Sequence, residues 1–325
     1  MQQPDALLAL VADIGGTNTR VALARGASVL PDTVQRFRNA EFPGLEPVLQ
    51  AYLATCAEKP VAACVAMAGP VHDGRGTLTN LDWSVDRDLI AQATGTAPVA
   101  VLNDLQAQGH ALGHIALDNL RAVAPGVTAG DHAARLVLGV GTGLNAALVF
   151  RTDAGTLVPP SESGHITLPV QDAEDLALWD WISAHHEFPG VEEVLSGRGL
   201  ERLYAFYLAR SGAATPTLSA GEIMAACTQP GLARDTVARF VQLLGRVTGN
   251  LALIQLPFGG IYLVGGVARA MAPHLGPMGF AKAFCDKGRF AAFMDQFPIW
   301  VVEDDYAALT GCAAHLSEIV TLNAL

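Results

Sequence analysis

The stretch LALVADIGGTNTR occupies residues 8–20, and the apolar run VAL follows it at 21–23. Nearly unbroken apolar residues before Asp13 are typical of a buried strand, and the second apolar run is typical of another. Gly15 and Gly16 lie between the two runs and favour a tight turn. The sequence therefore predicts a strand, a turn and a second strand near its start.

The turn has the composition of an anion-binding loop. Gly15 and Gly16 can adopt positive φ angles without steric cost, so successive backbone N–H groups can point into one concavity. The polar residues 17–19 can add hydroxyl and amide donors. Asp13 would place a carboxylate beside the anion, which makes sense if a cation such as Mg²⁺ lies between them. An ordinary hairpin turn without a ligand explains these residues equally well at this point.

Length and composition limit the class of protein. A chain of 325 residues exceeds the size at which one hydrophobic core usually keeps growing, so two domains are expected. Hydrophobic residues make up 51% and charged residues 16% of the chain, which leaves no room for long disorder. The net charge of −11 and the scattered Lys and Arg residues argue against a nucleic-acid or anionic-membrane surface.

The cysteines and the chain start indicate a cytoplasmic location. Five cysteines lie far apart, form no CxxC pair and mostly fall in apolar stretches, as is typical of reduced, buried thiols. No basic leader precedes the first strand, and no stretch reaches the roughly 20 apolar residues of a membrane span. We expect a protein without a signal peptide or membrane helix.

Strands and helices alternate along the chain, which predicts an α/β layer structure. Strands are expected at 29–37, 61–68, 98–102, 261–264 and 299–302. Helices are expected at 44–56, 86–95, from 104 toward 115, and at 173–185, 198–210, 220–227, 232–256 and 307–322. A segment rich in Gly, Pro and Ala, residues 121–131, indicates a domain boundary.

The first strand–turn–strand pattern has an internal repeat. Residues 8–22 align with residues 135–148, so that Asp13 falls on Gly139 and Gly15 on Gly141. Two such units could hold two phosphates of one nucleotide, with Gly265-Gly266 as a third backbone approach near the base or ribose. Neither turn carries a G-x-x-x-x-G-K-[ST] or G-x-G-x-x-G motif, so a Walker loop and a Rossmann fingerprint are not supported.

An ordered set of motifs covers nearly the whole chain. The set comprises DIGGTN at 13–18, LND at 102–104, GTGL at 141–144, SESGH at 161–165, EEVLSG at 192–197, VGGV at 264–267 and DKGRF at 286–290. In this order the motifs resemble the bacterial glucokinase family. The resemblance implies a two-domain hexokinase/actin-like (ribonuclease H-like) fold with an active-site cleft between the domains. It also implies a small α/β domain of residues 1–115 plus 304–325 and a large α/β domain of residues 116–303.

The resemblance further implies the activity and its ligands. The expected reaction is the ATP-dependent phosphorylation of glucose to glucose 6-phosphate by a homodimer, with Mg²⁺. The residues expected to bind the nucleotide are Asp13, Gly15, Gly16, Thr17, Asn18, Gly141, Thr142, Gly143, Gly265 and Gly266, and Asp13 is expected to position Mg²⁺ through water.

Asp104 is the candidate general base, since phosphoryl transfer to a sugar hydroxyl needs a base near that hydroxyl. The alternative is a structural role for Asn103 or Asp104 as a helix N-cap. By similarity to the family, the glucose ring is expected to contact Asn103, Asp104, Glu162, His165 and Glu192. Glu193 could take the place of Glu192.

Four departures from the family's pattern remove no predicted catalytic group, and one of them is Asp305-Tyr306-Ala-Ala308 in place of an Asn-Pro-Gly-Leu stretch. Asn145 stands where a glycine is usual, Ser163 interrupts a Glu-Gly-Gly-His pattern, and Arg198 replaces a proline. These departures bear on substrate affinity and rate more than on the type of reaction. Two alternative functions therefore stay open: a kinase for another hexose such as mannose or glucosamine, and a sugar-binding regulator with weak or no turnover.

Overall fold

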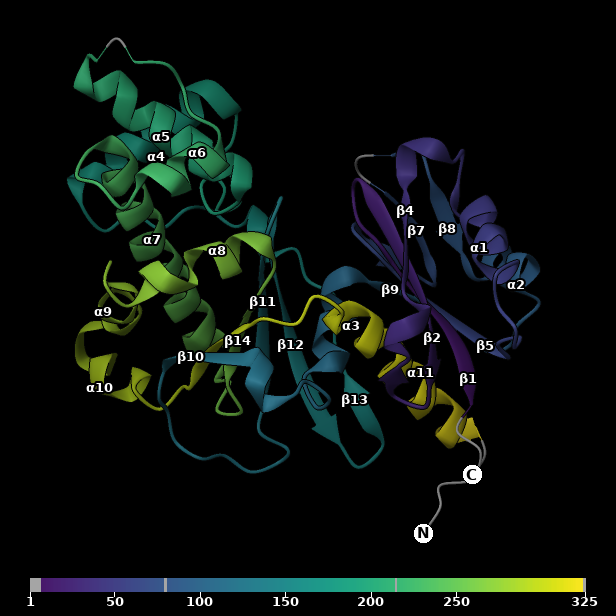
Figure 1. The fold of residues 1–325 in the computed structure, drawn as a ribbon. Coiled ribbons are helices and arrows are strands. Elements are labelled where there is room, and N and C mark those ends of the chain that lie inside the picture. The colour runs from purple at the N-terminus through teal and green to yellow at the C-terminus, as the bar shows by residue number, and fades with distance from the viewer. Residues whose placement is uncertain (1–6, 79–80, 214, 324–325) are drawn as a thin grey trace. The chain divides into compact units, whose positions relative to one another are not determined.

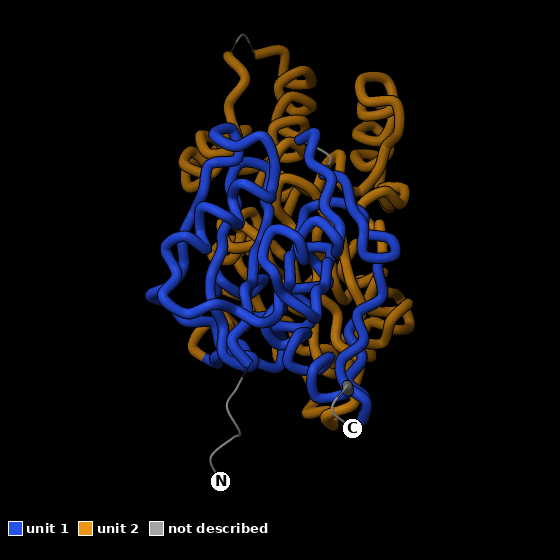
Figure 2. The backbone as a smooth tube through the Cα atoms, turned by 90° about the vertical axis from the view of Figure 1, so that its right-hand side faces the viewer, with its two compact units in different colours: residues 1–117, 149–160, 304–325 blue, residues 118–148, 161–303 orange. Residues whose placement is uncertain are grey.

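The computed structural model describes residues 7–78, 81–213 and 215–323. The chain divides into two compact units, shown in blue and orange in Figure 2. Unit 1 comprises residues 1–117, 149–160 and 304–325, and unit 2 comprises residues 118–148 and 161–303. The segment 149–160, which the predicted boundaries assign to the large domain, lies in unit 1.

Unit 1 is built on a mixed sheet with the strand order β3-β2-β1-β5-β9. Figure 1 labels β1, β2, β5 and β9 of this sheet. Strand β1 (Leu8–Ile14) pairs antiparallel with β2 (Asn18–Arg25), which confirms the predicted hairpin. Strands β5 (Ala62–Met67) and β9 (Val99–Asn103) continue the sheet in parallel with β1. The short strands β3 (Ser28–Val29) and β4 (Gln35–Arg38) both pair with β2.

The prediction of one strand over residues 29–37 is wrong. A 3₁₀ turn, Pro31–Thr33, separates β3 from β4. Pro31 has no N–H for a strand ladder, and Thr33 Oγ1 donates to Leu30 O at 2.6 Å, so local bonds replace the ladder here.

The two faces of this sheet have different side chains because alternate strand residues point to opposite sides. Large side chains such as Leu10 and Ile14 pack against helices α1 (Leu45–Leu53) and α2 (Arg87–Thr94). Small side chains such as Ala9 pack against helix α11 (Ala307–Asn323). Helix α3 (Asp104–Ala111) also lies on that side, and a Cβ at Gly311 of α11 would overlap a carbonyl of α3.

Helix α2 illustrates how well sequence can set helix ends. Asp86 Oδ1 accepts a hydrogen bond from Leu89 N at 2.8 Å, and Gly95 ends the helix in the left-handed conformation. Both ends agree with the predicted helix at 86–95. The loop strands β6 (Val71–His72), β7 (Arg75–Thr77) and β8 (Ser84–Asp86) form a separate three-stranded sheet before it.

The second six-stranded sheet has the order β10-β15-β14-β11-β12-β13. Its strands are β10 (Leu120–Ala124), β11 (Arg135–Val140), β12 (Leu144–Thr152), β13 (Gly155–Leu157), β14 (Ile261–Val264) and β15 (Ile299–Val302). Strands β11, β14 and β15 are parallel, as β1, β5 and β9 are in unit 1. The predicted repeat is therefore a repeat of strand order. Strand β10 occupies the first part of the segment 121–131, which its Gly, Pro and Ala content marks as a domain boundary. A strand forms there because these residues pair antiparallel with β15.

The helices of unit 2 pack around a core formed with β11 and β14. They are α4 (Ala173–His186), α5 (Gly197–Ser211), α6 (Ala220–Ala226), α7 (Leu232–Gln255), α8 (Gly266–Leu275), α9 (Phe280–Cys285) and α10 (Ala291–Met294). The structure confirms the predicted helices α4 to α7 and α11, and adds α8 to α10. The predicted α/β class is confirmed.

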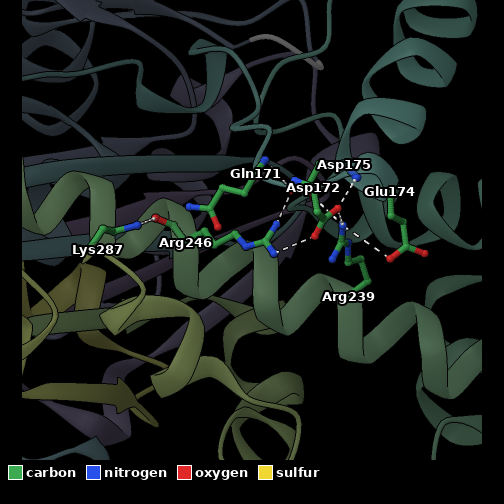
Figure 3. Close-up of polar contacts among 7 residues, drawn as sticks. All are labelled: Gln171, Asp172, Glu174, Asp175, Arg239, Arg246 and Lys287. Atoms are coloured by element: carbon green, nitrogen blue, oxygen red, sulfur yellow. Dashed lines mark hydrogen bonds and ion pairs between the residues drawn. The ribbon is translucent and has the colours of Figure 1, made fainter. Parts of the chain in front are cut away.

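A charged cluster joins the start of α4 to α7 (Figure 3). Asp172 caps α4, and its carboxylate also accepts from Arg239 at 2.6 Å and from Arg246 at 3.1 Å. Asp175, whose side chain is fully buried, binds both guanidinium groups as well. These ion pairs connect the start of α4 to α7.

Within the described residues, none of the helices combines the length and apolar character that a membrane crossing requires. The five cysteines are free, and Cys64, Cys227 and Cys312 are buried.

Candidate active site

Most of the predicted site residues lie at the carboxyl ends of parallel strands. In unit 1 the first turn follows β1, and Asn103 ends β9. In unit 2 the second turn follows β11, and Gly265 follows β14. Loops at the carboxyl ends of parallel strands are where α/β folds bind ligands. The predicted site residues of both sheets therefore gather at the carboxyl ends of the parallel strands.

The turn between β1 and β2 is closed by a hydrogen bond from Gly15 N to Asn18 O at 3.0 Å. Gly16 and Thr17 are exposed at its tip. Gly15 and Gly16 are not among the described glycines with positive φ, so the expected use of that conformation is wrong. The Gly15 N–H closes the turn itself, and Gly16 lies exposed at its tip.

Asp13 lies at the end of β1 and faces Arg20 on β2. The Arg20 guanidinium is 3.6 Å from Asp13 Oδ2, and the Asp13 side chain is 19% exposed. Burial raises the pKa of the Asp13 carboxyl above its usual value, although the charge of Arg20 opposes this. A cation beside this carboxylate would favour its ionised form.

Asn39 is a site residue that sequence reasoning missed. Its Nδ2 donates to Gly15 O at 2.8 Å, its Oδ1 accepts from Thr19 Oγ1 at 2.8 Å, and its backbone N donates to Thr17 O at 3.0 Å. Asn39 is only 2% exposed and Thr19 is fully buried. Asn39, in the segment after β4, thus holds the turn through two side-chain hydrogen bonds and one backbone hydrogen bond.

Asn103 and Asp104 lie where β9 passes into α3. Asn103 is the N-cap: its Oδ1 accepts from Leu105 N at 2.8 Å, and Gln106 Oε1 accepts from Asn103 N at 3.0 Å to complete a capping box. Asn103 Nδ2 also donates to Gly69 O at 2.9 Å. Of the two residues proposed as caps, Asn103 is the one that caps, which leaves Asp104 as the first residue of the helix.

The Asp104 carboxylate contacts the first turn of its own helix, where it shares the Leu105 N–H with the Asn103 side chain. Its Oδ1 accepts from Leu105 N at 2.8 Å. Gln106 links this turn to the segment 149–160 of unit 1, since its Nε2 donates to Val158 O at 2.8 Å. Asp104 therefore begins a helix whose start is fixed by the strand before it, by the capping box and by the Gln106–Val158 hydrogen bond.

The turn between β11 and β12 is the counterpart in unit 2. Gly141 N donates to Gly143 O at 2.9 Å, and Gly197 N donates to Gly141 O at 2.8 Å. Thr142 is exposed at the tip. Gly265 has a φ of 103°, and a Cβ there would overlap the Val140 carbonyl, so Gly265 lies directly beside this turn. Apart from the neighbouring residues of the chain, no atom of the described part of the chain lies within 4 Å of a Cβ built on Gly141 or Gly266, so both positions face open space.

Glu192 is attached to this same turn. Its Oε2 accepts from Leu144 N at 2.8 Å, and its Oε1 lies 3.4 Å from the Arg198 guanidinium. A Cβ at Gly143 would overlap Glu192 Oε2. Glu193 is instead paired with Arg202. Of the two adjacent carboxylates, Glu192 is the one beside the turn.

Glu162 and His165 belong to one short segment. Glu162 precedes a 3₁₀ turn, Ser163–His165, and its carbonyl accepts from His165 N at 3.2 Å. Both side chains are exposed. Gly164 packs so closely on β12 that a Cβ would overlap Leu144 O, and Gly164 O accepts from Glu192 N at 2.9 Å. Unit 2 therefore brings Glu162, His165 and Glu192 together around the start of β12.

The carboxylate of Asp13 and the turn after β1 are compatible with Mg²⁺ bound to a nucleotide. The described residues contain no group of three or more His, Cys, Asp or Glu side chains that could hold a metal ion. Mg²⁺ on a nucleotide needs no such cage, because one or two carboxylates, phosphate oxygens and water complete its octahedron. Asp13 beside a Gly-rich turn meets that requirement.

Comparisons with known proteins identify the family of this chain. The family model described as Glucokinase matches residues 10–319. Glucokinase of Chromohalobacter salexigens is 37% identical over 320 residues, which cover 96% of this chain and 99% of the relative.

Solved structures give the same result. Glucokinase from an Antarctic psychrotroph superposes with a TM-score of 0.85 at 32% identity, covering 97% of this chain and 99% of the other. A ROK family glucokinase from Streptomyces griseus, solved in complex with glucose and AMPPNP, shares the fold with a TM-score of 0.63 at 20% identity, covering 95% and 98%. These matches confirm the resemblance seen in the motifs, and the chain belongs to the glucokinase family.

Proposed function

We propose that this enzyme transfers the γ-phosphoryl group of ATP to the 6-hydroxyl of glucose, with Asp104 as general base. The observation that carries the proposal is the placement of Asp104 at the carboxyl end of β9, in the first turn of α3. The base takes the proton from the sugar hydroxyl as that oxygen attacks the γ-phosphorus. The bond from the γ-phosphorus to the bridging oxygen breaks, and ADP leaves.

Glucose is recognised by Asn103, Glu162, His165 and Glu192 in this proposal. Glu162 and His165 are exposed, and Glu192 is half-buried. Carboxylate oxygens and the imidazole can accept or donate hydrogen bonds to neighbouring hydroxyls of a sugar ring. The Asn103 amide already caps α3, so its remaining N–H and lone pair would serve the sugar.

The nucleotide phosphates bind at the Gly-rich turns, 15–18 and 141–143, and at Gly265-Gly266. Support comes from the open space beside Gly141 and Gly266 and from the AMPPNP, an ATP analogue, bound by the Streptomyces griseus relative. Asp13 holds Mg²⁺ through water, and the ion supplies positive charge to the phosphate oxygens.

Replacement of Asp104 tests the catalytic assignment. In Asp104→Asn and Asp104→Ala, we expect kcat to fall roughly 10²- to 10⁴-fold, as for loss of a general base. Glucose affinity, measured by isothermal titration calorimetry, should stay measurable. Asp88→Asn is the matched control, because Asp88 is an exposed carboxylate in the first turn of α2. Normal turnover of the Asp104 variants would overturn the assignment.

The choice of sugar is tested by ADP release across a panel of hexoses. We expect the highest kcat/KM with glucose, and strong rejection of analogues that lack a hydroxyl bound by Glu162 or Glu192, since a carboxylate would lose its partner. A higher kcat/KM for mannose or glucosamine would show a different hexose kinase. Glucose binding without any ADP release would show a sugar-binding regulator.

A homodimer in the cytoplasm is the state we propose for the enzyme, on the resemblance to the family and on the free cysteines. Size-exclusion chromatography with light scattering tests the first point. A mass of twice the chain's 33.9 kDa is expected. A monomeric mass across a range of concentrations would contradict it.

A further inference from the structure

Two successive residues of β12 hold the two carboxylates that the proposed function assigns to glucose. The backbone N–H of Leu144 donates to Glu192 Oε2 at 2.8 Å. The side chain of Asn145 reaches Glu162, with Nδ2 at 3.4 Å from Oε2. Both residues follow directly after the turn 141–143.

Asn145 contacts every residue from 161 to 163. Its Nδ2 also donates to Ser161 O, and its Oδ1 accepts from Ser163 N at 2.8 Å and from Ala146 N at 2.8 Å. A primary amide offers two donor hydrogens and two acceptor lone pairs. Four contacts use this capacity in full, so the amide has one orientation relative to the segment.

This segment depends on Asn145 for its polar contacts to β12. Gly164 packs on Leu144 by shape, but Glu162 itself is exposed and precedes the turn Ser163–His165. Without the amide, the backbone of 161–163 loses two hydrogen bonds and the carboxylate loses its donor.

We propose that Asn145 is a positioning residue that sets the affinity for glucose by holding Glu162 and its segment in register with Glu192. The inference rests on the proposed function, because it uses the role of Glu162 in sugar binding. Asn145 does not touch the reacting atoms in this proposal, and its effect reaches the sugar through Glu162.

The variant Asn145→Asp is the sharpest test. It keeps the shape and the acceptor oxygen, removes both donated hydrogen bonds, and places a carboxylate beside that of Glu162. We expect KM for glucose to rise roughly 10- to 100-fold. The value of kcat and KM for ATP should change little, because a lost ground-state contact to the sugar appears in KM.

A second variant, Asn145→Gly, removes the amide without adding charge. We expect a smaller rise in KM for glucose than in Asn145→Asp. The thermal unfolding midpoint of each variant shows whether it is folded, and the glycine variant carries the test if the aspartate variant does not fold.

A double-mutant cycle with Glu162→Gln separates positioning from a general loss of structure. Glu162→Gln alone should raise KM for glucose. In that background Asn145→Asp should add little, because the new carboxylate can accept a hydrogen bond from the glutamine amide. Independent effects that multiply would overturn the proposal, as would an unchanged KM in Asn145→Asp.

Ser163→Ala is the matched control in the same segment. It removes the hydroxyl contact to Ser161 Oγ at 2.6 Å but keeps the Ser163 N–H that Asn145 binds. KM for glucose should stay close to that of the wild type, and a rise equal to that of Asn145→Gly would overturn the specific role of Asn145. Failure of the proposed function has a different signature, since the wild type itself would then release no ADP with glucose.

Discussion

Asn39 shows how one buried amide can define a ligand loop from outside it. Its side chain and backbone bind Gly15, Thr17 and Thr19, so the first turn has its shape before any ligand arrives. Preorganised donors lower the cost of ordering a loop when it binds a ligand.

Replacement of Asn39 by alanine should affect stability and nucleotide binding together. The variant leaves the buried Thr19 hydroxyl and the Gly15 carbonyl without their partner, which costs about 1–3 kcal/mol of unfolding free energy. KM for ATP should rise while KM for glucose stays close to its wild-type value. Urea denaturation and steady-state kinetics measure the two effects.

Gln35→Ala is a suitable control on the same segment. Gln35 makes one exposed hydrogen bond, to Thr55 Oγ1 at 2.9 Å. Its loss should change the unfolding free energy by no more than about 0.5 kcal/mol. An Asn39→Ala protein with the stability and KM for ATP of this control would contradict the bracing role.

Among single residues, the sequence predicts the motif residues better than the residues that hold the motifs in place by hydrogen bonds. Asp13 and Asp104 stand out because each lies at the end of a buried apolar run, and Glu192 was expected from the resemblance to the family. Asn39 has no such signal, since it lies 20 residues after Thr19 and meets it only through the pairing of β2 with β4. The resemblance already favoured Glu192 over Glu193, and the structure adds that the two adjacent side chains have different partners.

Among the elements, the pairing of α4 with α7 depends on the charged cluster in Figure 3. Asp175 has a fully buried side chain and binds Arg239 at 2.7 Å, and it binds Arg246 as well. The side chains of these arginines are 7% and 11% exposed. Breaking a buried pair is costly because the remaining charge keeps its burial and loses its partner.

Asp175→Ala should therefore lower the free energy of unfolding by about 3–5 kcal/mol, as found when one member of a buried ion pair is removed. Urea denaturation followed by tryptophan fluorescence measures it, since Trp179 and Trp181 lie on α4. Glu174→Gln is the control: Glu174 is a partly exposed neighbour 3.5 Å from Arg239. Equal midpoints for the two variants would show that the cluster does not stabilise unit 2.

The same cluster makes the stability of unit 2 depend on pH under acidic conditions. Hydrogen bonds from Arg239 hold the pKa of the Asp172 carboxyl well below its usual value. A lowered pKa in the folded state means that the contribution is complete above the unfolded value of 3.8 and is lost as pH falls toward the folded value. Acid unfolding of unit 2 through this group is thus expected only well below pH 4.

Capped helices and buried central strands were both predicted accurately: the strands expected at 261–264 and 299–302 match β14 and β15. Helices with clear caps, such as α2 and α4, agree closely with their predicted ranges. The strand over 29–37 was wrong because Pro31 divides it, and β10 was missed because its partner β15 lies far along the chain. Local signals report helix ends, whereas strand pairing depends on distant residues.

For the molecule as a whole, a buried histidine pair sets a second acid dependence. The rings of His110 and His315 lie 4.4 Å apart, and the His110 side chain is 4% exposed. Burial, with the neighbouring His315, lowers the pKa of His110 to about 3. His110 is therefore neutral at pH 7, and its 4.0 Å approach to Glu318 is not an ion pair.

The sign of this effect follows from proton binding. Below the ordinary pKa of 6.5, the unfolded chain takes up a proton that folded His110 does not. Stability should therefore be complete above pH 6.5 and fall by about 1.4 kcal/mol per pH unit as the pH drops toward 3.

His110→Phe tests this dependence because it keeps an aromatic ring beside His315 and removes the titrating group. Unfolding free energies between pH 7 and 5 should fall less steeply in the variant. His114→Gln, an exposed position after the same helix, should keep the wild-type slope. Parallel slopes for all three proteins would contradict the assignment to His110.

The repeated strand order is the feature of the whole fold that sequence predicts best. Aligning residues 8–22 with 135–148 predicts two related hairpins, and both sheets place such a hairpin beside two parallel strands. The membership of 149–160 in unit 1 has no comparable signal, because β12 is one continuous strand whose later residues belong to the other unit.

The tight packing around Glu192 also restricts how this enzyme can be redesigned. Gly143 and Gly164 admit no Cβ without displacing Glu192 or the Leu144 carbonyl. In a mutant library designed for new sugars, substitutions at these two glycines would displace Glu192 or the backbone of Leu144. Position 198 already carries a side chain that contacts the carboxylate of Glu192, so a library there would vary sugar preference, whereas a library at position 145 would also change the hydrogen bonds that hold the backbone of 161–163.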